Sequence, residues 1–164
     1  MRQRTAGVIV LALLVVLVFV FFNSPAAFVD PGEYETTTVT VHDENGTELA
    51  TVDVKLADTP EKRQVGLSRT DSLDDAGMLF VHPETDTHTY HMRSMSFPLD
   101  IVFVAPDGTI TEIHQADVPT LWPLERYSGH GKYVLEVERG WTEEAGITAG
   151  DVVDIPENVT AQDS

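Results

Sequence analysis

The feature that most limits what this chain can fold into is a series of eight short runs rich in β-branched and aromatic residues, separated by turn residues. Such runs are typical of β-strands, and their close succession indicates a barrel or a sandwich. They cover residues 36–42, 49–56, 78–82, 87–93, 99–105, 110–115, 132–138 and 151–155. Asn45-Gly46 predicts a hairpin between the first two runs. Ala105-Pro106-Asp107-Gly108 predicts another between the fifth and the sixth.

Two short helices are predicted beside the strands. Asp58-Thr59-Pro60-Glu61 has the pattern of a helix start, with Asp58 as the cap and Glu61 three residues later as in a capping box. Gly66 is expected to end this helix, and residues 142–146 form a single capped turn before the last strand. The predicted fold is mainly β, or α+β: a compact barrel- or sandwich-like domain of about eight short strands and two short helices.

A hydrophobic segment, residues 6–22, precedes this domain and contains 17 consecutive uncharged residues. As a helix it spans about 25 Å, slightly short of the hydrocarbon core of a bilayer. Arg2 and Arg4 come before it, and no cation follows until Lys55. The positive-inside rule therefore predicts a single-pass helix with a cytoplasmic N-terminus and an extracytoplasmic domain at the cell membrane. The alternative is a signal peptide cleaved near Pro25-Ala26-Ala27, which would leave a secreted domain.

These features divide the chain into four parts. Residues 1–23 are the transmembrane anchor or signal segment. Residues 24–35, which contain Pro25, Pro31 and Gly32, form a linker without periodicity. Residues 36–157 form the β-rich domain. Residues 158–164 are a polar tail, whose last five residues are expected to be loose.

Charge is a further constraint on partners and solvent. The net charge is −17, and the chain after residue 23 carries all 27 acidic residues beside eight Lys and Arg residues, a net charge of −19. Such a surface repels nucleic acid, so no nucleic-acid partner is expected. A dense carboxylate surface suits concentrated salt, which screens self-repulsion, and we interpret it as halophilic adaptation. The chain has no cysteine, which excludes disulfides and thiolate metal sites.

Several motifs in the chain resemble those of a known family. They are Gly66-Leu67-Ser68, Gly77-Met78-Leu79-Phe80-Val81, Met92, Phe97-Pro98-Leu99-Asp100-Ile101-Val102-Phe103-Val104, Asp107-Gly108, Ile113, Tyr133-Val134-Leu135-Glu136, Gly140, Gly146-Ile147 and Gly150-Asp151. In order and spacing, over residues 52–155, they resemble the domain of unknown function 192 family, in a haloarchaeal-like member. The resemblance implies a small β-rich domain, often behind a signal or an anchor, and no established activity.

Three positions depart from the pattern of that family. Ser68 stands where the family usually has Met, and His91 stands where it has an aromatic residue. Thr70 occupies the place of a family Arg, while Arg69 lies one position earlier. The resemblance therefore assigns no role to Arg69 or His91.

The strongest candidate for a polar site is Asp100. It is the only charged residue in residues 99–104, a run whose two faces are both largely apolar, as in a central strand. A carboxylate buried there needs a cation or several N–H donors, and Arg93, or else Arg69, is the expected partner. With His91, these residues are the predicted binding site. The structural alternative is a buried ion pair, or a capping Asp that fixes the loop at residues 94–98.

Other candidates give weaker signals. Glu136 alternates with Val134 and Glu138 and is expected on a solvated face. His88 and His91 are three residues apart, which places them on opposite faces of a strand, so no metal site is predicted, and no cofactor. Gly129-His130-Gly131 is too short for a phosphate loop, and the serines lie in no Gly-x-Ser-x-Gly elbow. No catalytic residue is assigned.

Two functions remain open from the sequence. The first, which the lack of catalytic motifs favours, is a non-enzymatic binding or accessory module, attached to the membrane through residues 6–22 and serving an unknown protein or small-molecule ligand. The second is a hydrolase or lyase that uses Asp100 with a histidine. The two differ in geometry, because a catalytic pair needs the carboxylate and the base in one pocket.

Overall fold

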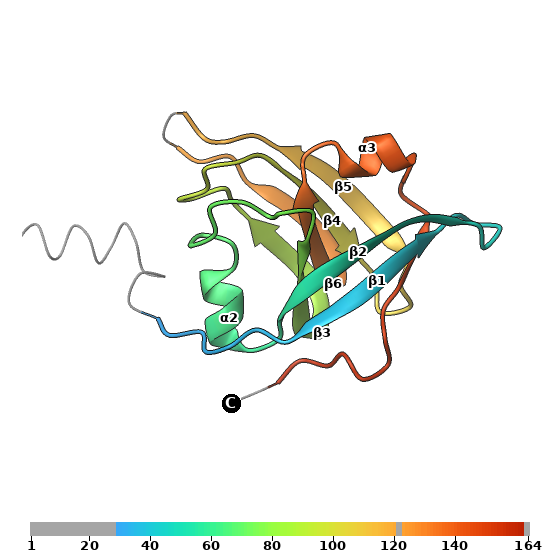
Figure 1. Cartoon of the computed structure of the whole chain (residues 1–164), viewed down its shortest axis with the longest axis horizontal. Coiled ribbons are helices and arrows are strands. Elements are labelled where there is room, and N and C mark those ends of the chain that lie inside the picture. Colours follow the sequence, from blue (N-terminus) through green and yellow to red (C-terminus); the bar gives the residue numbers. More distant parts are fainter. Residues whose placement is uncertain (1–28, 121–122, 163–164) are drawn as a thin grey trace, which may run out of the picture.

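In the computed structural model, one sheet of seven strands organises the part of the chain that the structure describes, residues 29–120 and 123–162. The strands lie in the order β5-β4-β6-β3-β2-β1-β7 (Figure 1). In chain order the elements are β1 (Thr36–His42), β2 (Glu48–Ala57), α2 (Pro60–Val65), β3 (Gly77–Tyr90), β4 (Leu99–Val104), β5 (Ile110–Ala116), β6 (Tyr127–Glu138), α3 (Trp141–Ala145) and β7 (Val152–Asp154). The expected mainly-β fold with two short helices is confirmed.

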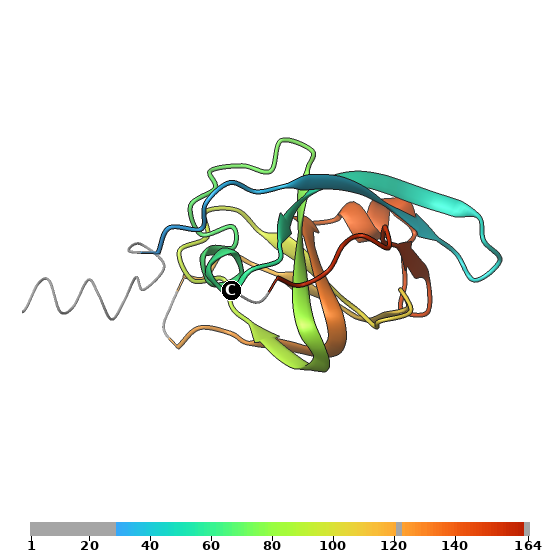
Figure 2. The same cartoon turned by 90° about the horizontal axis from the view of Figure 1, so that it is seen from below.

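The sheet curls because its two edge strands approach each other. Thr109, just before β5, forms an antiparallel bridge with Val152 of β7. The N–H of Ile110 donates to the carbonyl of Asp151 at 2.8 Å. These contacts bend the sheet into a half-barrel, and the β2–α2–β3 connection supplies its parallel strand pair. Figure 2 shows the two longest strands, β3 in green and β6 in orange, side by side across it.

Most predicted strands are confirmed, and one pair is corrected. Both hairpin turns form as expected: Gly46, with φ of 81°, closes β1–β2, and Gly108, with φ of 89°, closes β4–β5. The runs at residues 78–82 and 87–93 are not two strands but one, β3, which ends at Tyr90 and leaves residues 91–93 outside the sheet. The chain stays extended through Pro83, and a register shift between Val81 and Asp86 absorbs the irregular residues. The described residues therefore form seven strands instead of eight.

Two apolar layers lie on the two faces of the sheet. The inner layer fills the half-barrel with side chains from all seven strands, among them Val39, Val54, Leu79, Val102 and Leu135. The outer layer covers β3, β4 and β6 and includes Met78, Phe80, Ile101, Phe103 and Val134. All six residues of β4 are buried, so the expected central strand is confirmed.

β6 begins five residues earlier than expected because two glycines fit it against β4. A Cβ atom on Gly131 would lie 2.6 Å from the carbonyl oxygen of Val104, and one on Gly129 would overlap the ring of Phe103. Side chains at these positions would push the strands apart. The Gly129-His130-Gly131 sequence is thus part of a strand.

Helix α2 starts one residue later than predicted. Its cap is Thr59, whose Oγ1 accepts the N–H of Lys62 at 3.2 Å, and it ends at Gly66 as expected. Asp58 instead forms an ion pair with the Lys62 ammonium at 2.8 Å. Gln162 donates its backbone N–H and its side-chain amide to Asp58 at 2.8 and 2.7 Å. The tail is therefore docked as far as Gln162, so the expectation of loose residues is wrong for residues 160–162, while residues 163–164 lie outside the described residues.

The described chain begins beside α2. The Arg69 guanidinium donates to the carbonyl of Val29 at 2.6 Å, and the Lys62 ammonium lies 5.8 Å from the centre of the Tyr34 ring. In residues 29–120 and 123–162, no helix is long and apolar enough to cross a membrane. The predicted span at residues 6–22 lies outside the described residues.

Candidate functional site

A cavity of about 680 Å³ lies on the outer face of the sheet, at the side of α2. One wall is formed by α2 and the residues that follow it, another by the outer faces of β3 and β6, and a third by residues 91–95. It is lined by Arg63, Gln64, Val65, Gly66, Leu67, Ser68, Arg69, Phe80, His82, His88, Thr89, Tyr90, His91, Met92, Arg93, Ser94, Met95, Leu99 and Glu136. The wall combines apolar side chains with a few polar and charged side chains that can form hydrogen bonds with a ligand.

Three arginines, Arg63, Arg69 and Arg93, make this wall electropositive. They are three of the eight cations in a chain segment with 27 acidic residues, and among the described residues Glu136 is the only acid that lines the cavity. The Nη1 atom of Arg63 donates to the carbonyls of Asp58 and Val81, both at 2.8 Å, which fixes α2 against β3. Arg63 is in none of the ion pairs between described residues, so its charge faces the cavity uncancelled by a contacting carboxylate.

A second group of lining residues comes from β3. Nε2 of His82 and the Tyr90 hydroxyl are hydrogen bonded at 2.9 Å, and the rings of His82 and His88 stack with centroids 3.5 Å apart. Burial, together with the neighbouring His88 and Arg63, lowers the pKa of His82 to about 4. Burial also raises the pKa of Tyr90 well above its usual value. Both groups are therefore neutral at pH 7.

Glu136 is the lining residue that the sequence placed wrongly. It was expected on a solvated face, but it is 6% exposed, near the end of β6, where it lies between Met78 of β3 and Ile101 of β4. Burial raises the pKa of its carboxyl to about 8. Its run, residues 133–137, contains no other charge and lies in a central strand. Glu136 thus has the same pattern as Asp100, a single charge within an apolar run of a central strand.

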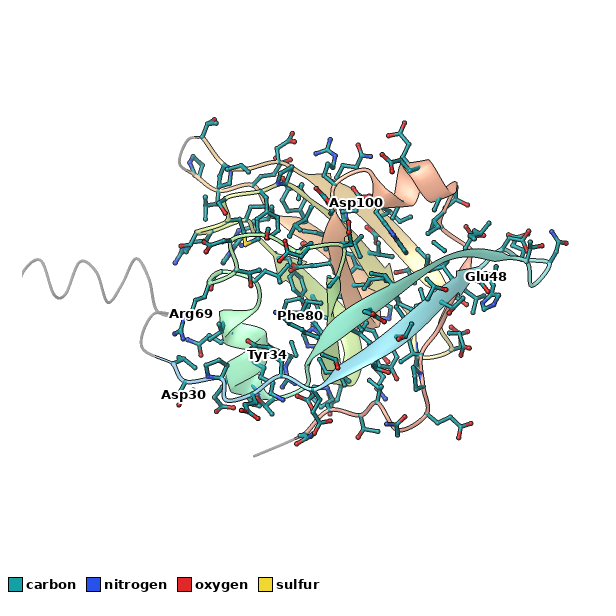
Figure 3. The ribbon with its side chains drawn as sticks, in the orientation of Figure 1. Asp30, Tyr34, Glu48, Arg69, Phe80 and Asp100 are labelled. Atoms are coloured by element: carbon teal, nitrogen blue, oxygen red, sulfur yellow. The ribbon has the colours of Figure 1, made fainter. Side chains whose placement is uncertain are left out.

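The predicted site residues fall into two places. Arg69, His91 and Arg93 all line the cavity. Asp100 is not among the lining residues, because Leu99 and Ile101 on either side of it belong to the outer layer and Asp100 points to the other face. Figure 3 shows Asp100 near α3, well away from Arg69 beside α2. The structure thus does not bring Asp100 together with the histidines of the cavity.

Asp100 is buried, with 0% exposure, but its partners are not arginines. Its Oδ2 atom accepts the N–H of Gly140 at 3.2 Å, the N–H of Thr142 at 3.0 Å and the Thr142 hydroxyl at 2.6 Å. The expectation that Arg93 is its partner is therefore wrong. The need for several donors is met by the start of α3, which Asp100 caps from a neighbouring strand.

Metal ligands do not gather in the described part of the chain. No group of three or more His, Asp or Glu side chains there is arranged to hold a metal ion. The donor set of the cavity is instead suited to organic ligands: three guanidinium groups, neutral imidazoles, a phenol, a neutral carboxyl and apolar side chains.

Two solved structures share this fold. One is from Sinorhizobium meliloti 1021, described as a candidate transcription regulator. It is 31% identical, with a TM-score of 0.66, and the match covers 76% of this chain and 97% of that one. The other, a protein of unknown function from Novosphingobium aromaticivorans DSM 12444, is 30% identical, with a TM-score of 0.64 and coverage of 79% and 96%. No curated protein matches the chain.

The family profile of domain of unknown function 192, described as an uncharacterized ACR, matches residues 40–155. This range includes both helices, all lining residues of the cavity and every strand of the sheet, apart from the first residues of β1. The chain therefore belongs to the DUF192 family.

Proposed function

We propose that the domain is a non-enzymatic binding module on the outer face of the cell membrane, and that its cavity binds a small organic anion with an apolar body. The observation that carries this proposal is the concentration of Arg63, Arg69 and Arg93 around one cavity in a domain that is otherwise strongly acidic. The acidic surface of the rest of the domain repels anions, so arginines gathered at a single concave site favour an anionic ligand there.

The size and the wall of the cavity support a small-molecule ligand. A volume of about 680 Å³ lies within the usual range for sites that enclose small molecules. Leu67, Phe80 and Met92 are buried side chains of the wall, and Met95 adds a half-buried one. Methionine adapts its shape to different apolar partners. The ligand is thus expected to carry a hydrophobic part as well as its anionic group.

The attachment of the linker supports a position close to the bilayer. The predicted span ends at residue 22, and Val29 is hydrogen bonded to Arg69 at the cavity wall. Seven residues of chain reach at most about 25 Å. An uncleaved anchor would therefore hold the cavity within reach of amphiphilic anions at the membrane surface. Mass spectrometry of the membrane fraction tests the anchor, since a mature N-terminus near Ala27 would show cleavage.

A dye pair tests the binding proposal. 8-Anilinonaphthalene-1-sulfonate has an anionic group on an apolar body, and N-phenyl-1-naphthylamine is the same body without the anion. The full chain in lipid nanodiscs, in molar KCl, is titrated with each dye. We expect Arg93→Gln to weaken binding of the anionic dye about tenfold, the loss of one charge-assisted hydrogen bond, and to leave the neutral dye unchanged.

Two further variants distinguish dye binding in the cavity from dye binding to the protein surface or to the lipid. Arg126→Gln removes the same charge at an exposed position outside the cavity wall and should not change either affinity. Met95→Trp keeps the charge but fills the cavity, and should reduce binding of both dyes. Equal binding by Met95→Trp and the unmodified protein would contradict the proposal.

A further inference from the structure

Glu136 occupies a position in which a charged side chain is costly. It lies in the middle of the sheet, with Met78 and Ile101 as its neighbours on the two flanking strands. Among the described residues it takes part in no ion pair and in no side-chain hydrogen bond. An apolar residue would pack there at lower cost. A carboxyl without a partner that lines a cavity instead points to a role towards the contents of that cavity.

The form of the carboxyl decides what it can bind. Burial raises the pKa of Glu136 to about 8, so at pH 7 the group is a neutral acid with one O–H donor. Charged groups on the facing elements are Arg63 on α2, and Arg69 and Arg93 on the loops after α2 and β3. An organic cation would be repelled by these arginines. An oxyanion is attracted by them and accepts the hydrogen bond of the neutral acid.

We infer that Glu136 is a specificity-determining residue that donates a hydrogen bond, as a neutral carboxylic acid, to the oxyanion group of the ligand in the cavity. This inference rests on the proposed function and adds to it the chemical class of the ligand: molecules with an oxyanion that accepts hydrogen bonds, and not organic cations. Tyr90 lines the same cavity: burial raises the pKa of its hydroxyl, the neighbouring Glu136 raises it further, and Arg63 lowers it.

Glu136→Gln is the variant that separates this role from a structural one. The amide of glutamine keeps a donor at the same place but does not titrate. Glu136→Leu removes the donor and keeps the volume approximately. Burial keeps the neighbouring His82, His88 and Tyr90 neutral between pH 7 and 9, and arginine stays charged. His91 is exposed and also lines the cavity, so His91→Gln is the control for any contribution of this residue to the pH dependence.

The experiment measures the affinity for 8-anilinonaphthalene-1-sulfonate from pH 7 to pH 9, with the full chain in nanodiscs. The sulfonate stays ionised over this range. We expect the affinity of the unmodified protein to fall about tenfold by pH 9, as Glu136 loses its proton. Glu136→Gln should change less than about twofold over the same range. Glu136→Leu should bind the anionic dye about tenfold more weakly at pH 7 and bind N-phenyl-1-naphthylamine normally.

The outcomes distinguish this inference from the proposed function. If the anionic dye binds in an Arg93-dependent way but Glu136→Leu binds it as tightly as the unmodified protein, the role of Glu136 is refuted and the binding module stands. The same holds if Glu136→Gln retains the full dependence on pH. If no variant of the cavity changes the affinity for either dye, both proposals fail. Loss of the neutral dye by Glu136→Leu would show a packing role instead, and would also refute the inference.

Discussion

The carboxylate of Asp100 accepts both the backbone N–H and the hydroxyl of Thr142, at 3.0 and 2.6 Å, across 42 residues of sequence. This contact joins the start of β4 to the first turn of α3, and it satisfies donors that a helix start leaves without partners. Because both residues are buried, the contact acts on stability and not on the cavity, which Asp100 does not line.

Asp100→Asn and Thr142→Val should therefore destabilise the domain without changing ligand binding. The Oδ1 atom of Asp100 is buried without a hydrogen-bond partner, so an amide NH2 group at that place would also lack an acceptor. We expect each variant to lower the free energy of unfolding by roughly 1–3 kcal/mol. Urea denaturation in molar KCl measures this.

Asp117→Asn is the matched control for Asp100→Asn. It makes the same change in an exposed ion pair with Arg139 and should stay within about 0.5 kcal/mol. Normal stability of Asp100→Asn together with lost dye binding would show that Asp100 is a functional carboxylate after all.

Asp100 and Glu136 also show how far the sequence could be interpreted. Local pattern was enough to predict that Asp100 is buried in a central strand, and the same pattern around Glu136 was outweighed by its alternation with Glu138. The partner of Asp100 could not be predicted, because Thr142 reaches it only through the packing of α3 on the sheet. Arg69, His91 and Arg93 were predicted as one site and do share a cavity, since Arg69 follows α2 and the other two follow β3.

The buried carboxyl of Glu136 should make stability depend on pH. Below about pH 4.5 both the folded and the unfolded chain hold this proton. Between pH 4.5 and 8 the unfolded chain has released it and the folded chain has kept it, so the free energy of unfolding falls by about 1.4 kcal/mol per pH unit. At pH 7 the cost is on the order of 3 kcal/mol.

Urea denaturation of the unmodified protein and Glu136→Gln, at pH 5, 6, 7 and 8, measures this contribution. The difference should move in favour of the variant as the pH rises, because glutamine does not titrate. Glu138→Gln, two residues along β6 and exposed, should show no such trend. A constant difference between the unmodified protein and Glu136→Gln would mean that the carboxyl is ionised in the folded protein.

The Asp58–Lys62 ion pair should contribute to stability through burial. Asp58 is 2% exposed and Lys62 is 7% exposed, with their charged atoms 2.8 Å apart. Lys62→Met would leave the carboxylate buried with only Gln162 as a side-chain partner, which should cost about 3–5 kcal/mol. The double variant Asp58→Leu with Lys62→Met should recover a large part of that loss, because it removes both charges.

Gln162→Ala measures the share of the docked tail in the same contact and should cost about 1 kcal/mol. We test whether Asp58 is the centre of this contact by comparing the free energies of unfolding of four proteins: the unmodified protein, Lys62→Met, the double variant and Gln162→Ala. If Lys62→Met has the same free energy of unfolding as the unmodified protein, the Asp58–Lys62 pair is exposed to water in solution and the tail is not firmly docked against it.

The acidic surface should make folding depend on salt. The chain after residue 23 has a net charge of −19, and its carboxylates repel one another unless salt screens them. We expect the melting temperature of residues 30–164 to rise between 0.1 M and 3 M KCl by at least about 5 °C, equivalent to about 1 kcal/mol.

Asp71, Asp74 and Asp75 are exposed on one loop, and Asp74 and Asp75 have φ of 49° and 64°, which asparagine also adopts. Changing all three to Asn removes charge without strain, so it should raise the melting temperature at low salt and reduce the salt dependence. An unchanged melting temperature from low to high salt would show that the carboxylates are far enough apart for repulsion to be negligible, and the halophilic interpretation would then be wrong.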